Sequence, residues 1–497
     1  MKFLIAILLI IVNIPAIGQD SFIIHKQGIN PYNKPKDMII KPNGNMIFLY
    51  TSIPLWSNDI DVNYIYEIND NGEVVGSASY TDTNNKHVES NHCVFTNDTL
   101  YIFGSGSNFG TPEDAFIFML KYDLQYNLIE SFKYNSVLNG FGGTLHGKHK
   151  FINDKFYYIT AAGNQSRVAP LCAVISKQGQ LIDFGIDLNF PNTDIVPFDF
   201  DNHIFDNGYK IFAGTLGFWG APEVCGLICY FSREFQMEDF FLLPFEMDAY
   251  FTYQPVNDSV FYIAGEWKDW GSSTIKRAGI LKLMNDTTVV NKFLYAAEPD
   301  SSACPAYRNS LEILPDGNLI FCFTDNIDVE TFPTLSPTKI NLMKLTPDFD
   351  IIWHRYIGDG INSWHAWVMK VNEAEEIIIH GSYHIPDISH YQNRDVLFIK
   401  TTKNGLITGT NDEPSVVRST EAIVYPNPAA DYIQVEFSMA HNQATFSLLD
   451  ISGKTVFKKQ LTTNKQSLDI SGIPAGSYIY RVFNTKGLDE KGKLMVE

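Results

Sequence analysis

The sequence predicts an all-β protein in which one short unit is repeated many times and a smaller β-domain follows. Two observations support this prediction. Turn-forming pairs such as Asn43-Gly44, Asn97-Asp98 and Asp316-Gly317 recur between apolar runs, and these residue types favour the tight turns of β-hairpins. The runs between the turns lack the 3.6-residue apolar period of an amphipathic helix.

The hairpin occurs seven times, and each copy is followed by a second strand-turn-strand segment. One unit therefore has four antiparallel strands in about 55 residues. Repeated four-stranded units without helices are typical of β-propellers, so the sequence predicts a seven-bladed β-propeller over residues 19–410, with residues 21–26 closing the last blade. A β-solenoid is the alternative, but its repeats are generally shorter. The turns are anchored, 51 to 59 residues apart, at Gly44, Asp98, Asp154, Asn207, Asp258, Gly317 and Glu373.

The first residues predict export. Residues 1–18 contain one Lys, a continuous apolar run and the small-residue ending Ala16-Ile17-Gly18, which is the pattern of a secretory signal peptide. No later segment is apolar enough to cross a bilayer. We therefore expect an exported, soluble protein without a transmembrane segment.

A polar linker, residues 411–420, separates the repeats from residues 421–497, whose short strands and turns predict a small β-sandwich. This region has a Tyr-Pro-Asn-Pro stretch, an Asp-x-x-Gly-Lys turn, a Pro-x-Gly-x-Tyr stretch and a basic last strand. These motifs resemble the C-terminal sorting domain of the type IX secretion system of Bacteroidota, which has an Ig-like β-sandwich fold. The motif residues are Tyr425, Pro426, Asn427, Pro428, Gly453, Gly476 and Tyr478.

The resemblance implies that the type IX secretion machinery is a partner. It implies passage through the periplasm and the outer membrane, removal of the domain, and attachment to the cell surface or release. Residues 421–497 contain eight acidic and eight basic side chains, so the net charge of -19 belongs to the rest of the chain. Such a charge argues against nucleic acid as a partner.

No motif assigns catalysis or a cofactor. The six cysteines include no CxxC pair, and neither a GxSxG nor an HExxH motif occurs. We therefore expect no cofactor and no metal and assign no catalytic residue. The sequence leaves the disulfide and oligomeric states open.

Tryptophans in the long connections between strands are candidates for ligand binding, because aromatic side chains on loops of a rigid scaffold commonly form binding surfaces. Such a surface would bind a glycan or a protein. The alternatives are that these rings cap the blade cores or serve packing between subunits. The candidates are Trp56, Trp219, Trp267, Trp270 and Trp364.

Histidines near the start of different first strands form a second candidate group, because the first strands of a propeller converge on its channel. With nearby carboxylates they could bind a metal or transfer protons. The repeat, however, places some residue there in every blade, including Asp37, Tyr250 and Arg308. We predict a binding protein, and the alternative is a polysaccharide lyase or glycoside hydrolase with its site at the channel mouth. The histidines are His92, His146, His203 and His365.

Overall fold

The computed structural model of the chain is built from antiparallel β-sheets, and no helix occurs among the residues that it describes. The described residues are 21–26, 32–54, 60–82, 87–108, 111–134, 144–163, 168–186, 194–200, 208–216, 226–242, 247–268, 276–285, 288–295, 301–327, 336–386, 394–407, 417–419, 422–425, 429–437, 444–450, 454–463, 465–484 and 489–496. The expected signal peptide, residues 1–18, lies outside them.

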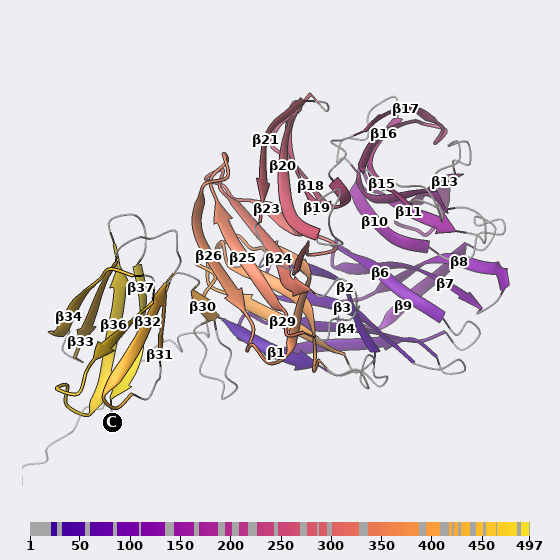
Figure 1. Ribbon diagram of the computed structural model, residues 1–497. Coiled ribbons are helices and arrows are strands. Elements are labelled where there is room, and N and C mark those ends of the chain that lie inside the picture. The colour runs from indigo at the N-terminus through magenta and orange to yellow at the C-terminus, as the bar shows by residue number, and fades with distance from the viewer. Residues whose placement is uncertain are drawn as a thin grey trace, which may run out of the picture.

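The described strands up to Ser419 form seven sheets, which we number along the chain (Figure 1). Sheet 1 consists of β2 (Tyr32–Ile40), β3 (Met46–Ile53), β4 (Val62–Ile68) and β5 (Val74–Tyr80). Sheet 2 consists of β6 (His87–Thr96), β7 (Thr99–Asn108), β8 (Thr111–Tyr122) and β9 (Leu128–Tyr134). Sheet 3 consists of β10 (Thr144–Ile152), β11 (Lys155–Gly163), β12 (Val168–Ser176) and β13 (Leu181–Ile186).

The next three sheets continue the pattern. Sheet 4 consists of β14 (Asp194–Phe200), β15 (Gly208–Leu216), β16 (Gly226–Ser232) and β17 (Met237–Leu242). Sheet 5 consists of β18 (Met247–Pro255), β19 (Val260–Lys268), β20 (Lys276–Met284) and β21 (Thr288–Leu294). Sheet 6 has its first strand split into β22 (Ser302–Pro305) and β23 (Leu311–Ile313), followed by β24 (Leu319–Ile327), β25 (Lys339–Leu345), β26 (Ile351–Ile357) and β30 (Val417–Ser419).

Sheet 7 joins the two ends of this region. It consists of β27 (Ser363–Val371), β28 (Ile377–His384), β29 (Asp395–Thr401) and, as its fourth strand, β1 (Phe22–Lys26). The N-terminal strand pairs antiparallel with β29, and Ile24 lies opposite Phe398. Figure 1 shows the indigo β1 beside the orange strands of this sheet.

The hairpin turns have the local geometry that their residues favour. Asn97 and Asp98 both have positive φ, 48° and 55°, as the two central residues of a type I′ turn require. Asn153 and Asp154 repeat this geometry between β10 and β11. Gly44, with φ of 85°, occupies a left-handed position that side chains rarely adopt. The turn chemistry seen in the sequence therefore fixes where the strands reverse.

Seven hydrophobic clusters lie between successive sheets, and the last of them joins sheet 7 to sheet 1. In that last cluster Phe48 of β3 stacks on Phe398 of β29, with ring centroids 4.4 Å apart. Middle strands such as β3 are buried along almost their whole length, whereas the outer strand β5 is largely exposed. Sheet 1 thus packs its two faces on its neighbours and exposes most of its outer strand to solvent.

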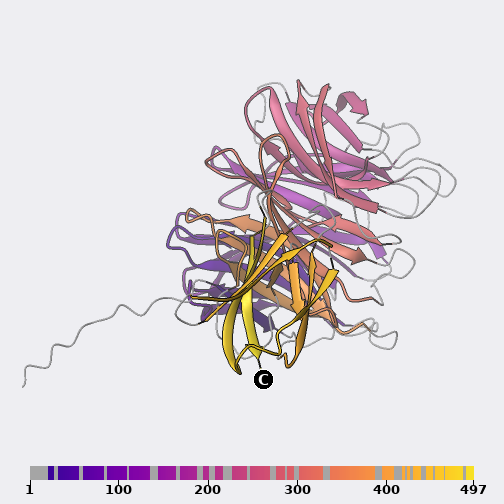
Figure 2. The same cartoon turned by 60° about the vertical axis from the view of Figure 1, so that its left-hand side comes forward.

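The C-terminal part forms two further sheets, drawn in yellow, which Figure 1 shows beside the seven and Figure 2 shows in front of them. Sheet 8 consists of β31 (Ala422–Tyr425), β32 (Tyr432–Phe437) and β35 (Lys465–Asp469). Sheet 9 consists of β34 (Thr455–Leu461), β33 (Ala444–Leu449), β36 (Gly476–Phe483) and β37 (Asp489–Val496). Both contribute to one core, with Ile433 and Val435 from sheet 8 and Phe446 and Val482 from sheet 9.

Candidate functional site

The first strands of the sheets lie against one another and enclose a cavity. β2 contacts β6 and β27, β6 contacts β10, and β18 and β27 both contact β23. Side chains from β2, β6, β10, β18, β23 and β27 and from the break between β22 and β23 line a cavity of about 270 Å³. This size is close to the lower end for ligand sites, about 300 Å³, and suits a small ligand or the end of a longer one.

Irregularities in β2, β6 and β10 aim side chains into this cavity. The pairing register shifts between Pro35 and Asp37 in β2 and between Ser90 and His92 in β6. A similar shift follows Leu145 in β10. A β-bulge redirects the side chains that follow it. Asp37 and His92, which directly follow their bulges, both line the cavity.

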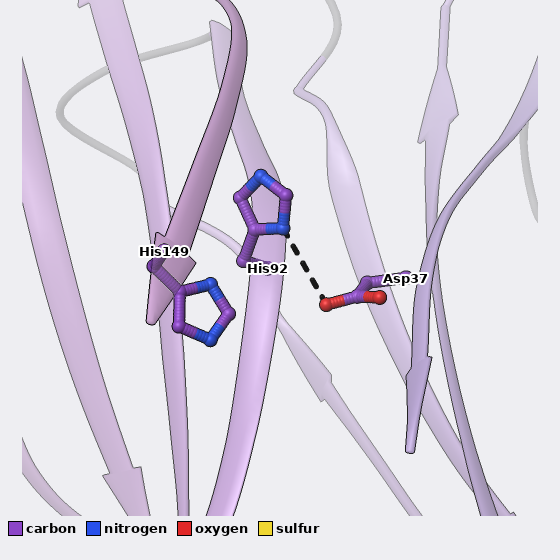
Figure 3. Close-up of side chains that lie close together, drawn as sticks. All are labelled: Asp37, His92 and His149. Carbon is purple, nitrogen blue, oxygen red and sulfur yellow. Dashed lines mark ion pairs between the residues drawn. The ribbon is translucent and has the colours of Figure 1, made fainter. Parts of the chain in front are cut away.

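Asp37, His92 and His149 lie together at the wall of the cavity (Figure 3). The Oδ2 atom of Asp37 is 3.5 Å from Nδ1 of His92. The carboxylate also accepts hydrogen bonds from the backbone N–H groups of Met38 at 2.8 Å and Cys93 at 3.1 Å. The ring of His149 lies edge to face with that of His92, with centroids 4.9 Å apart. Three different sheets therefore position this group.

Arg308 determines which nitrogen of His92 carries the proton. It lies in the break between β22 and β23, and its Nη1 is 2.7 Å from Nε2 of His92 and 2.8 Å from the carbonyl oxygen of Asn91. Because a guanidinium group can only donate, Nε2 of His92 must accept. The proton of a neutral His92 therefore lies on Nδ1, on the side of Asp37.

The surroundings keep both imidazoles neutral and Asp37 ionised near pH 7. Burial, and then the charge of Arg308, hold the pKa of His92 well below its usual value. Burial lowers the pKa of His149 to about 4. Burial opposes ionisation of Asp37, but its hydrogen bond with His92 and the neighbouring positive charges hold its pKa below the usual range. Nδ1 of His149 is buried and has no hydrogen-bond partner within the described part of the chain.

The spacing of Asp37, His92 and His149 would allow metal binding, because one ligand atom from each lies within 4.8 Å of the others and these residue types bind zinc. The charge of the lining acts against it. Four basic side chains line the cavity, and Asp37 and Glu312 are its only acidic ones within the described residues; the basic ones are Lys148, Lys150, Arg308 and Lys370. A cation would meet an excess of positive charge, whereas an anion would be attracted.

A buried ion pair adjoins the cavity through Asn91. The side chain of Lys36 is 1% exposed and forms an ion pair with Glu89. Its Nζ is also 3.4 Å from Oδ1 of Asn91, which lies 3.4 Å from Nη2 of Arg308. Burial lowers the pKa of Lys36 to about 7, although Glu89 partly opposes this. Hydrogen bonds through Asn91 therefore connect Arg308 to the titratable pair Lys36 and Glu89.

The structure brings only part of the predicted histidine group to this site. His92 lines the cavity, together with Asp37 and Arg308. His365 does not, because it precedes the bulge of β27; its ring is buried and stacks on His384 at 5.4 Å. His146 belongs to β10, but its side chain is not described, and His203 lies outside the described residues.

The tryptophan prediction needs correction where the structure describes it. Trp267, 2% exposed, belongs to β19 and packs in the cluster between sheets 4 and 5. Trp364, 5% exposed, belongs to β27 and packs between sheets 6 and 7. Both lie in strands that extend further than the sequence suggested, so neither ring belongs to an exposed loop face. Three other candidates lie outside the described residues: Trp56, Trp219 and Trp270.

The C-terminal motif is described in part. Tyr425 ends β31 and Gly476 begins β36. Tyr478, 8% exposed, belongs to the core of sheets 8 and 9, and its hydroxyl donates to the carbonyl oxygen of Pro474 at 2.7 Å. The remaining motif residues lie outside the described part of the chain: Pro426, Asn427, Pro428 and Gly453. No helix within the described residues is long and apolar enough to cross a membrane.

Comparison with solved structures gives matches of low identity. A catalytically inactive virginiamycin B lyase from Staphylococcus aureus is 11% identical, with 76% of this chain and 99% of that chain covered and a TM-score of 0.42. The polysaccharide lyase Uly1 is 9% identical, with coverages of 74% and 90% and a TM-score of 0.46. A sialidase from Trypanosoma rangeli is 9% identical, with coverages of 93% and 84% and a TM-score of 0.38. TM-scores this low support no statement about activity.

Comparison with curated proteins gives no match. A family model, by contrast, identifies the end of the chain: residues 423–497 match the secretion system C-terminal sorting domain. This domain directs proteins to the cell surface or the extracellular space. The match starts at residue 423, which is the second residue of β31. The last 75 residues of this chain are therefore a type IX secretion C-terminal sorting domain.

Proposed function

We propose that the region before the sorting domain is a seven-bladed β-propeller that binds a saccharide in the cavity between its first strands. In this proposal residues 1–18 are a signal peptide, residues 19–410 the propeller, residues 411–420 a linker and residues 421–497 an Ig-like sandwich. The type IX machinery delivers the protein to the cell surface or releases it. The closed succession of hydrophobic clusters between sheets, ending between sheets 7 and 1, supports the propeller.

The observation that carries the proposal is the polar lining of the cavity. A repeat whose first strands served only packing would place similar apolar residues at the central position of each sheet. Instead the sheets contribute Asp37, His92, Lys148, Arg308 and Lys370. A buried polar atom without a partner is unfavourable, and Nδ1 of His149 has none among the described residues. A ligand bearing hydroxyl groups would satisfy it.

A glycan array screened with the exported protein tests this function, followed by two sets of variants. His149→Ala alters the cavity, whereas Trp219→Ala and Trp270→Ala alter the loop candidates. We expect His149→Ala to weaken binding at least about tenfold, as loss of a buried hydrogen bond does, while its melting temperature stays within a few degrees of wild type. Loss of binding in the tryptophan variants alone would place the ligand on the loops and overturn the proposal.

A second candidate function is polysaccharide cleavage at the same cavity, by a lyase or glycoside hydrolase mechanism. It is favoured by the cluster of Asp37, His92 and His149, because neutral imidazoles beside an ionised carboxylate can transfer protons at neutral pH. Incubation of the protein with each glycan that it binds separates the two functions. A binding protein leaves the chain length unchanged, whereas a hydrolase releases new reducing ends and a lyase also creates a carbon–carbon double bond that absorbs ultraviolet light.

A further inference from the structure

The charges that line the cavity indicate which saccharides it would accept. Four basic side chains face Asp37 and Glu312 across about 270 Å³, in a chain whose net charge is -19. Such a local excess of positive charge attracts a negatively charged group, because charges interact more strongly where water is partly excluded.

Lys370 is the clearest contributor to this attraction. It belongs to β27, two residues after Val368, and both side chains line the cavity. Its ammonium group forms no hydrogen bond or ion pair with any residue that the structure describes. Its positive charge nevertheless acts on Asp37, His149 and Glu312. Lys370 is therefore close to the acidic and histidine side chains of the lining.

Arg308 contributes a positive charge at a fixed position. Its guanidinium group donates to the carbonyl oxygen and Oδ1 of Asn91 and to His92. A guanidinium held in this way attracts a carboxylate or sulfate group without having to reorganise.

The acidic residues of the lining distinguish an acidic sugar from an inorganic anion. Asp37 and Glu312 line the same cavity and can accept hydrogen bonds from hydroxyl groups, which sulfate or phosphate ions do not offer in their fully ionised form. A ligand that combines an anionic group with several hydroxyls satisfies both the basic and the acidic part of the lining.

We propose that the cavity binds an acidic saccharide, whose carboxylate or sulfate group lies between Arg308 and Lys370 and whose hydroxyl groups face Asp37 and Glu312. This inference rests on the proposed saccharide-binding function and specifies its ligand class. It excludes a resident metal at Asp37, His92 and His149, because the same cations that attract the acidic group repel a divalent ion.

Isothermal titration calorimetry of the full chain tests the inference with four saccharide probes. These are oligomers of galacturonic acid, their methyl esters, neutral galactose oligomers and sulfated galactose oligomers. We expect at least one acidic series to bind about tenfold or more tightly than the ester and neutral series. The ester and neutral oligomers lack the anionic group and therefore cannot form its charge-assisted hydrogen bond. The carboxylate and sulfate arms identify which anionic group the cavity prefers.

A matched pair of variants locates the effect. Lys370→Met should weaken binding of the acidic oligomer about tenfold and leave the melting temperature unchanged, because the ammonium group has no described partner to lose. Lys121→Met is the control, because Lys121 pairs with Glu130 at 3.0 Å on the outer strands of sheet 2, away from the cavity. It should not change binding.

The failures can be told apart. If no saccharide binds, the proposed function itself is wrong. If neutral and esterified oligomers bind as tightly as acidic ones and Lys370→Met has no effect, the cavity binds saccharides without selecting for charge and this inference is overturned. Three further results would also overturn it: binding of inorganic sulfate alone as tightly as the saccharides, preference for a poly-glutamate peptide, and Zn²⁺ binding that His149→Ala abolishes.

Discussion

Replacement of Asp61 by Asn should stabilise the part of the protein formed by sheets 1 to 7 at neutral and alkaline pH. Asp61 directly precedes β4, and its side chain is 2% exposed. Its Oδ2 accepts a hydrogen bond from the N–H of Val88 at 3.1 Å, whereas its Oδ1 has no hydrogen-bond partner within the described residues. Burial, and then the charge of Glu89, raise the pKa of Asp61 from the ordinary value of 3.8 to about 7. The folded protein therefore resists ionisation of this group.

The direction of the pH effect follows from this shift. Below about pH 4 the carboxyl is protonated in the folded and the unfolded chain, so its ionisation costs nothing. Between about pH 4 and pH 7 the unfolded chain loses the proton first, and the folded state becomes less stable as the pH rises. A shift of about three pKa units corresponds to about 4 kcal/mol. This is the largest gain that Asp61→Asn could give above pH 7, because Asn keeps the acceptor for Val88 and carries no charge.

Urea unfolding followed by tryptophan fluorescence measures this gain. All seven tryptophans precede the sorting domain. The fluorescence signal therefore reports unfolding of the region before that domain. The difference in unfolding free energy between Asp61→Asn and wild type should be small at pH 4 and reach about 2 to 4 kcal/mol at pH 8. Asp258→Asn, at an exposed turn, is the control and should show no such rise. A difference that is flat between pH 4 and pH 8, or that favours the wild type at pH 8, would refute the reasoning.

Three further predictions concern packing, closure of the sheets and export. Gly104→Ala should destabilise the protein by about 3 kcal/mol, because the new Cβ would lie 2.2 Å from the backbone oxygen of Glu89; Gly358→Ala, whose new Cβ would have no neighbouring atom closer than 3.4 Å, should be nearly neutral in the same urea titration. His380→Leu should cost about 2 kcal/mol, because the ring nitrogens of His380 lie 3.0 and 3.1 Å from carbonyl oxygens of sheets 1 and 7; an unchanged unfolding midpoint would contradict this role. Deletion of residues 421–497 should leave a folded protein in the periplasm, detected by cell fractionation, and continued secretion would disprove the need for the sorting domain.

The sequence predicts the hairpin turns well because their main signal is local. A tight turn needs residues that tolerate positive φ, and Asn97-Asp98 and Asn153-Asp154 adopt that geometry with few contributions from distant residues. The sorting domain is recognised for a similar reason, because its motif residues lie in short stretches of the chain. Turn chemistry and motif spacing can therefore be found by inspection of one sequence.

The cavity could be predicted only in part, because it depends on the pairing register. A shift of one residue moves a strand side chain to the other face of its sheet. His149 reaches the cavity because the register shift in β10 precedes it, whereas His365 precedes the corresponding shift in β27 and is buried elsewhere. No turn residue or apolar pattern marks these bulges. For the same reason, the sequence alone does not assign Lys148 and Lys370 to the cavity.

The tryptophans show a related limit, which concerns where strands end. The sequence places Trp267 in a long connection between strands, yet β19 continues to Lys268 and pairs Trp267 with Arg277 of β20. Burial of a large ring between two sheets makes a large contribution to stability. Hydrophobic packing with the next sheet, which the local sequence does not reveal, therefore decided the position of this ring.

The first strands combine two roles that would otherwise conflict. On either side of the bulge they carry apolar residues into the clusters between sheets, as Met38 and Val88 do. At the bulge they direct polar residues such as Asp37 and His92 towards the cavity, while the hydrogen-bonded ladder continues before and after it. The position of the cavity residues is thus set by the repeated architecture, but their identity is not. The same scaffold could keep its fold while these few positions change, which is why ligand chemistry must be argued from the cavity residues themselves.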